Sequence, residues 1–197
     1  MKQAITKISN SKSPGLNNVP PDAFKVLDEK NLLTLMNLFK SYWMEETDFT
    51  EWHEGQLVPV FKSGDLSETN KWKGATLMDT GSKIFSSIPC TRLFKIIRKH
   101  GVKYQFGSTP GVGCQDGSFT IRTMSHLRYN DNLPTFVTFA NFVKSFDTSN
   151  HKLMAEILNK YGCPPKLCSA IRRMYTDKKV ILILGKIDIS IPFEVGL

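Results

Sequence analysis

The chain has 197 residues, of which 41% are hydrophobic and 22% are charged, and this ordinary balance excludes a wholly disordered protein. No apolar run reaches the ~18 residues that a membrane-spanning helix needs, and no signal-peptide core follows the N-terminus. The formal charge of +8 favours a polyanionic partner, nucleic acid before membrane, with a basic solvated surface as the alternative.

The cysteines argue against a zinc site, because only the last two of the four are close in sequence and no histidine lies beside them. We expect reduced thiols and an intracellular protein, in the nucleus or the cytoplasm. The four residues are Cys90, Cys114, Cys163 and Cys168.

The first third of the chain predicts a loop followed by a helix. Residues 1–21 are polar and end in a Pro- and Gly-containing run, which is typical of a loop or linker. Asp22 can cap a helix that runs to about Glu46 and carries apolar residues at helical spacing. These residues, which we expect in the core, are Phe24, Leu27, Leu35, Leu38 and Tyr42.

The next segment predicts a short strand, a turn and a second helix. The strand covers 56–62, and Pro59 within it indicates an edge or irregular strand. A turn follows at 63–65. Ser82 can cap a helix through about Lys99, in which Pro89 should cause a kink or a break.

A glycine-rich loop at 104–117 precedes a third predicted helix. The loop is not a phosphate-binding P-loop, because it lacks the Gly-Lys-Ser/Thr ending. The helix that follows should reach about Tyr129, with Phe119, Met124 and Leu127 facing inward.

The segment 135–142 is apolar, β-branched and aromatic, and it predicts a buried strand with Phe136, Phe139 and Phe142 in the core. Polar residues 144–147 follow it. The remainder predicts a helix at 151–161 ended by Gly162, a helix from Pro165 to about Tyr175, and two β-rich segments, 179–187 and 188–193, joined by a turn near Gly185.

Residues 139–147, Phe-Ala-Asn-Phe-Val-Lys-Ser-Phe-Asp, resemble motif A of non-LTR (LINE-type) retrotransposon reverse transcriptases, Phe-x-Asp-Phe/Leu-x-Lys-Ala-Phe-Asp. Three further blocks are similar to elements of that family in the same order. They are Lys-Ser-Pro-Gly-Leu-Asn-Asn-Val-Pro at 12–20, the segment around Lys62 and Lys73, and the Gln-rich and Gly-rich run 105–117. The resemblance covers residues 12–197.

The resemblance implies an α+β fold, a right-hand polymerase with helix-rich fingers, a partial palm and short antiparallel strands. It divides the chain into an N-terminal loop segment at 1–21, a fingers-like region at 22–134 and a partial palm at 135–197. The family's motifs B and C would follow residue 197, so we expect a fragment of the family's polymerase region. Family members are RNA-directed DNA polymerases that use Mg²⁺, deoxynucleotides, an RNA template and a DNA primer. The resemblance therefore implies nucleic-acid partners and no membrane partner.

The resemblance also assigns roles to individual residues. Lys62 and Lys73 match basic residues that contact the triphosphate of the incoming nucleotide, although any single lysine is by default a surface residue. Phe146 matches the steric gate against a ribose 2′-hydroxyl, and Ser145 replaces the usual small alanine. Asp147 matches a structural aspartate that can cap the following helix. The template-path candidates are Gln105, Gln115 and Asp116.

Asn141 stands where the family has its metal-binding aspartate. A neutral amide at ~4 Å from a cation loses roughly 4 kcal/mol at an effective dielectric constant near 20, or about a thousandfold in rate. The Tyr/Phe-x-Asp-Asp motif, which supplies two more carboxylates in the family, is missing from the sequence. We therefore expect no competent metal site and an inactive polymerase, with a non-catalytic RNA- or DNA-binding remnant and a decayed element without selected function as the alternatives.

Overall fold

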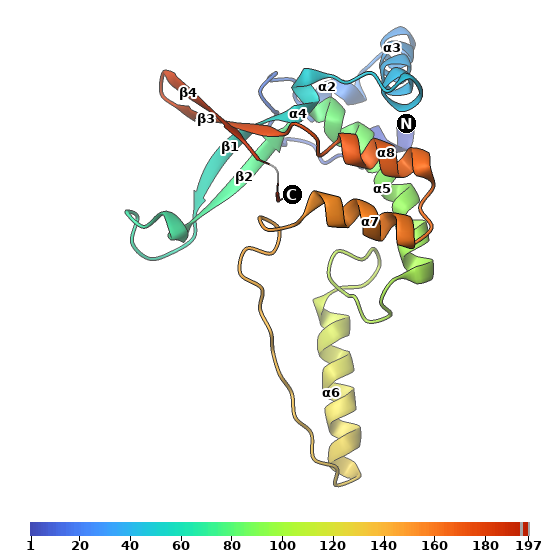
Figure 1. The fold of residues 1–197 in the computed structure, drawn as a ribbon, viewed down its shortest axis with the longest axis vertical. Coiled ribbons are helices and arrows are strands. Elements are labelled where there is room, and N and C mark those ends of the chain that lie inside the picture. The colour runs from blue at the N-terminus through green and yellow to red at the C-terminus, as the bar shows by residue number, and fades with distance from the viewer. Residues whose placement is uncertain (194, 197) are drawn as a thin grey trace.

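The computed structural model describes residues 1–193, 195 and 196, and it shows a group of helices beside one four-stranded sheet (Figure 1). The mixed helix and strand content agrees with the predicted α+β class. Glu194 and Leu197, which belong to the expected palm segment, lie outside the described residues. No described helix is long and apolar enough to cross a membrane.

The sheet has the strand order β2-β1-β3-β4. Its strands are β1 (Glu54–Phe61), β2 (Trp72–Met78), β3 (Lys179–Leu184) and β4 (Ile187–Pro192). The β3–β4 pair is the expected antiparallel hairpin. The β1–β2 pair is also antiparallel, but β2 is not among the predicted strands, and β1 and β3 are parallel. The parallel pair is possible because the long excursion from β2 through the helices brings the chain back in the same direction.

Proline 59 explains why β1 is central along only half of its length. The strand pairs with β3 from Glu54 to Leu57, whereas Pro59 lies beyond that ladder and faces Gly74 of β2. Pro59 has no N–H to donate, and it lies in the half of β1 that has no β3 partner. The predicted edge strand is correct at Pro59 and wrong for the first half of β1.

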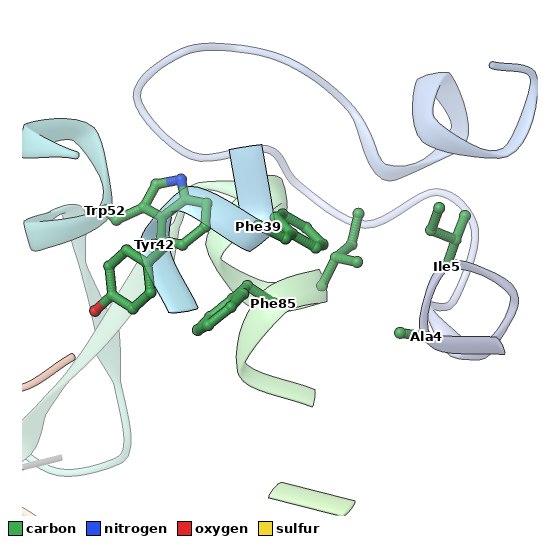
Figure 2. Packing of buried hydrophobic residues seen from close by; sticks show 7 residues of the cluster. Ala4, Ile5, Phe39, Tyr42, Trp52 and Phe85 are labelled. Carbon is green, nitrogen blue, oxygen red and sulfur yellow. The ribbon is translucent and has the colours of Figure 1, made fainter. Parts of the chain in front are cut away.

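The aromatic core packs around the junction of the N-terminal helices with α5. Its centre is Tyr42, with Phe39, Trp52 and Phe85 close around it (Figure 2), and Ile84 belongs to the same buried cluster. Tyr42 and Phe85 meet edge to face with ring centroids 4.7 Å apart. The helices involved are α1 (Lys2–Lys7), α3 (Glu29–Lys40), the π-helical turn η1 (Ser41–Glu45), α4 (Thr50–His53) and α5 (Thr80–His100).

The predicted helix at 22–46 is interrupted. A short α2 (Pro21–Lys25) ends before Val26, and α3 begins anew at Glu29. The Asp28 side chain caps α3 by accepting a hydrogen bond from the Asn31 amide at 2.8 Å. Asp22 is therefore not the cap of the long helix, because Asp28 provides a second start signal inside the apolar pattern.

The N-terminal loop is fixed to the start of α5. A Cβ on Gly15 would lie 2.7 Å from the backbone of Met78 and Asp79, so only glycine fits this approach. Asn17 donates a side-chain hydrogen bond to the Asp79 carboxylate, and the Thr80 hydroxyl donates to the Val19 carbonyl at 2.9 Å. The loop is thus part of the packed structure and not a free linker.

Helix α5 starts one turn earlier than Ser82 and continues through Pro89. Asp79 is its cap and accepts from the Ser82 amide at 3.1 Å. The predicted break at Pro89 is absent, and Pro89 itself is fully buried. Packing of the surrounding residues holds the helix together where one hydrogen-bond donor is missing.

Helices α7 (His151–Lys160) and α8 (Pro165–Arg173) form a second cluster, and both confirm the predicted elements. Gly162, with φ of +73°, ends α7 as expected. The buried residues of the cluster are Leu158, Cys163, Leu167, Cys168 and Ile171. The four cysteines are free, in agreement with reduced thiols.

A partly buried arginine joins α8 to the aromatic core. The Arg173 guanidinium lies over the Tyr42 ring, 4.3 Å from its centroid, and donates to the Tyr42 carbonyl oxygen. Its ion pair with Asp48 spans 3.6 Å. Arg173 lies 131 residues from Tyr42 in sequence and therefore connects two distant segments.

Residues 114–149, which we call the arm, consist of α6 (Cys114–Asn130) and an extended return segment. Helix α6 points away from the rest of the molecule, which we call the body (Figure 1). The predicted inward residues Phe119, Met124 and Leu127 are exposed, because no other described element covers α6.

The predicted buried strand at 135–142 is extended and unpaired. Phe136 is 94% exposed and Phe139 is 85% exposed, so the prediction that they and Phe142 lie in the core is wrong for this structure. Among the described residues, no backbone hydrogen bond involves residues 136–143. The apolar pattern predicts burial, but no described strand lies beside this segment to provide it.

Candidate functional site

The β1–β2 hairpin brings Lys62 and Lys73 together. The Lys62 amide donates to the Lys71 carbonyl at 2.9 Å, which extends the ladder in which Val60 faces Lys73. Residues two apart along a strand share a face, so Lys62 lies diagonally across from Lys73 on one face of the hairpin. Both side chains are exposed, and neither forms an ion pair within the described part of the chain.

The three template-path candidates lie around the start of α6. Gln105 is in the preceding loop, where its side chain donates to the Gly107 carbonyl at 3.1 Å. Gln115 is exposed in the first turn of the helix. The Asp116 carboxylate accepts from the Gly113 amide at 2.7 Å, so this residue stabilises the helix start.

The motif A residues lie on the return segment of the arm and the turn that follows. Asn141 and Ser145 are exposed, and Phe146 is 63% exposed. Lys144 adopts a left-handed backbone with φ of +51°, an uncommon conformation for a residue with a side chain. The backbone then turns tightly, with the Thr148 amide donating to the Lys144 carbonyl at 3.1 Å.

Asp147 does not cap α7. The cap is Asn150, whose side chain accepts from the Leu153 amide at 3.0 Å. Asp147 is exposed and lies three residues before the cap, beside the backbone of Gly196. The prediction fails because the turn at 144–149 postpones the helix start, and Asn150 is the better placed of two suitable residue types.

The described residues do not fit a divalent metal. No group of three or more His, Cys, Asp or Glu side chains among them could hold a metal ion. Mg²⁺ requires hard oxygen ligands and is usually held by carboxylates, whereas residue 141 supplies a neutral amide on an unpaired segment. No catalytic step through a metal is therefore derived for this chain.

A groove of about 690 Å³ lies where the start of α7, the end of α8 and the sheet meet. The groove is lined by residues 150–152, by 172 and 175–179, and by Pro192, Phe193 and Val195. The Gly196 amide donates to the Ser149 carbonyl at 2.9 Å, and Asn150 forms a β-bridge with Val195. These contacts place the turn at 144–149 beside the groove.

Four lysine and arginine side chains line the groove. Lys152, Arg172, Lys178 and Lys179 face one acidic residue, Asp177. Lys179 pairs with Glu54 at 2.7 Å, and the Lys178 amine donates to the Trp52 carbonyl at 2.6 Å. Burial lowers the pKa of Lys178 from 10.5 to about 8, because a desolvated amine loses part of the stabilisation of its charge.

Sequence reasoning missed this groove. The doublets Arg172-Arg173 and Lys178-Lys179 were its only signal, and the arginine doublet divides between two roles. Arg173 faces the aromatic core, whereas Arg172 is exposed in the groove. The order of charged residues along the sequence does not distinguish a cation that packs within the protein from one that faces solvent.

The predicted site residues thus form separate groups in this structure. Lys62 and Lys73 lie on the hairpin, Gln105, Gln115 and Asp116 around the start of α6, and Asn141 to Asp147 at the end of the arm. Within the described residues, no hydrogen bond or ion pair joins one group to another. The arrangement offers cationic surfaces to an anion and no assembled catalytic centre.

The chain is similar to a transposon-encoded protein. It is 23% identical over 188 residues to the "Transposon TX1 uncharacterized 149 kDa protein" of Xenopus laevis. The match covers 92% of this chain but 14% of that much longer protein. No family model matches the chain. The similarity supports a transposon-related origin.

Proposed function

We propose that the chain is the fingers and first part of the palm of a non-LTR retrotransposon reverse transcriptase, and that it binds nucleic acid without polymerising it. In this proposal residues 1–21 are an N-terminal segment, 22–134 the fingers and 135–197 the partial palm. The full enzyme of this type is an RNA-directed DNA polymerase. Template and primer binding is the part of that activity assigned to this chain.

One observation carries the proposal. Motifs that resemble the family occur in the family's order from residue 12 to the end of the segment, and 92% of the same chain matches a transposon-encoded protein. A chance match would affect one motif and not an ordered series. The net charge of +8 supports the same partner class, since a phosphate backbone attracts a basic protein.

The proposal assigns no catalysis to this chain. Asn141 replaces the motif A aspartate, and the sequence contains no Asp-Asp pair. Two-metal nucleotidyl transfer depends on carboxylates that hold both ions, so one neutral amide does not sustain it. The remaining residues contribute to binding. Lys62 and Lys73 would contact the triphosphate of a nucleotide. Phe146 would lie against its sugar, and the small side chain of Ser145 would let the triphosphate approach the backbone.

The test combines a binding assay with a primer-extension assay on the purified chain. We expect salt-sensitive binding of an RNA-template and DNA-primer duplex and no extension with Mg²⁺ and deoxynucleotides. The variant Asn141→Asp should still fail to extend, because the other carboxylates are missing. Extension by the unaltered chain would overturn the inactivity.

A matched pair of variants tests the hairpin. The double change Lys62→Gln and Lys73→Gln should weaken deoxynucleoside triphosphate binding, whereas Arg98→Gln with Lys99→Gln removes the same charge from the end of α5 and should not. Equal losses in both would show a general charge effect. Absence of any nucleic-acid binding would favour a remnant without function.

A further inference from the structure

The groove described above is built from three segments that are distant in sequence. Helix α7 contributes Asn150 to Lys152, the end of α8 and the following turn contribute Arg172 and 175–179, and the end of β4 contributes Pro192 and Phe193. In Figure 1 the start of α7 lies below the end of α8 and close to the C-terminal end of the chain. The groove is therefore fixed by packed elements and does not depend on the arm.

Two of the four cationic side chains in the groove already form contacts within the protein, and the other two are available to a ligand. Lys178 donates to the Trp52 carbonyl, and Lys179 pairs with Glu54. Lys152 and Arg172 are exposed and form no ion pair within the described part of the chain. A bound anion would therefore meet Lys152 and Arg172 without displacing a contact of the fold.

The wall of the groove is partly aromatic. Tyr175 packs against His151 with ring centroids 5.0 Å apart, and Phe193 lines the same space. Cationic side chains beside aromatic rings are typical of surfaces that bind single-stranded nucleic acid, because the cations neutralise phosphates while the rings stack on bases. A small phosphate ion would contact the cations alone and would make no use of the aromatic rings.

We propose that this groove binds the phosphodiester backbone of a single nucleic-acid strand, with Lys152 and Arg172 contacting phosphates and Tyr175 offering a surface to a base. The inference rests on the proposed function and deepens it, since it names a path for the strand beside the motif A turn. The groove adjoins that turn through the contact between Gly196 and Ser149. A strand in the groove would thus lead toward Ser145 and Phe146.

The experiment measures the affinity of the chain for a labelled single-stranded RNA of about 12 nucleotides by fluorescence anisotropy over a range of salt. For single strands each phosphate contact contributes ~0.7 to the slope of log K against log salt. The variant Lys152→Gln with Arg172→Gln should therefore lower the slope by about 1.4 and the affinity at 0.1 M salt by about 20-fold. Both residues are exposed, so the variant should keep its thermal midpoint.

The control variant Arg98→Gln with Lys99→Gln has the same net charge and should keep the slope of the unaltered chain. If both variants lose equally, the groove is no more than part of a basic surface and the inference is overturned. Binding of a polyglutamate chain that depends equally on Lys152 and Arg172 would also overturn it. If the unaltered chain binds no RNA, the proposed function fails together with the groove, which distinguishes that outcome from a failure of the groove alone.

The single change Tyr175→Leu tests the aromatic wall independently of charge. It should weaken RNA binding by about fivefold or more, since a stacked base contributes ~1–3 kcal/mol. The salt slope should stay constant, because no phosphate contact is lost. A change of slope with unchanged affinity at low salt would contradict the assignment of Tyr175 to a base.

Discussion

The body and the arm of this molecule differ in what happens to their aromatic side chains. In the body, Phe85 is 3% exposed and makes edge-to-face contacts with Phe39 and Tyr42. In the arm, Phe136 and Phe139 are almost fully exposed. Both regions carry apolar patterns that predict burial, so the pattern alone does not determine burial.

The comparison teaches that burial depends on a partner surface as well as on a pattern. The aromatic residues of the body come from α3, η1, α4 and α5, which converge on one point (Figure 2). The arm offers apolar residues on both faces of an extended segment, and neither face meets a described neighbour.

Truncating one phenylalanine in each region tests the contrast directly. Phe85→Ala should lower the free energy of unfolding by about 3–5 kcal/mol, since it removes buried surface and leaves a cavity. Phe139→Ala should change it by less than about 0.5 kcal/mol. Denaturant unfolding of both variants measures the difference. A loss of several kcal/mol in Phe139→Ala would mean that the arm is packed in solution.

A second test uses pH, because the body contains the partly buried amine of Lys178. Its pKa lies near 8 in the folded chain and near 10.5 when unfolded, so the unfolded chain binds more protons between these values. Stability therefore gains from Lys178 as pH rises through this window, by up to about 3 kcal/mol. Below pH 8 the amine is charged in both states and its full cost is present.

Other groups oppose this gain, so the comparison needs a variant. Burial raises the pKa of Tyr42 to about 12 and that of Cys163 to about 11, and both groups reduce stability at high pH because they ionise first in the unfolded chain. The difference in unfolding free energy between the unaltered chain and Lys178→Met isolates the lysine. It should rise between pH 8 and 10.5, and a flat difference would contradict the burial of the amine.

A third test compares two glycines, one in the body and one at the base of the arm. A Cβ on Gly15 would meet the backbone of Met78 and Asp79 at 2.7 Å, whereas one on Gly113 meets no described atom within 4 Å. Gly15→Ala should cost about 1–3 kcal/mol through forced displacement of backbone, and Gly113→Ala less than about 0.5 kcal/mol. Thermal unfolding of both variants gives the comparison.

Much of the fold could be predicted from the sequence where the determinants are local. Gly162 ends α7, the two prolines at 164 and 165 precede α8, and the β3–β4 hairpin follows from β-rich residues around Gly185. Local signals fail where a second one competes, as when Asp28 restarts the helix that Asp22 seemed to begin. They also fail at Pro89, where buried packing preserves the helix.

Less of the candidate site could be predicted, because a site depends on long-range contacts. The register that places Lys62 near Lys73 is set by pairing along β1 and β2, and the sequence predicts a strand only for the first of these two segments. The groove around Lys152 and Arg172 requires α7 and α8 to pack against each other. Nothing in the sequence around either residue distinguishes it from an ordinary surface cation. Resemblance to a family assigned roles to residues, but it did not indicate that the arm would be uncovered.

The smallest expected effect lies at the junction where the arm ends and α7 begins. Asn150 accepts a hydrogen bond from the Leu153 amide, whereas Asp147 accepts none from α7. Asn150→Ala should therefore cost about 1 kcal/mol of unfolding free energy, and Asp147→Ala less than about 0.5 kcal/mol. Equilibrium unfolding in urea measures both, with the change Asn150→Asp as a control that keeps a capping side chain and should retain most of the stability. If Asp147→Ala cost more than Asn150→Ala, the helix would begin earlier in solution, and the turn at 144–149 would belong to the body and not to the arm.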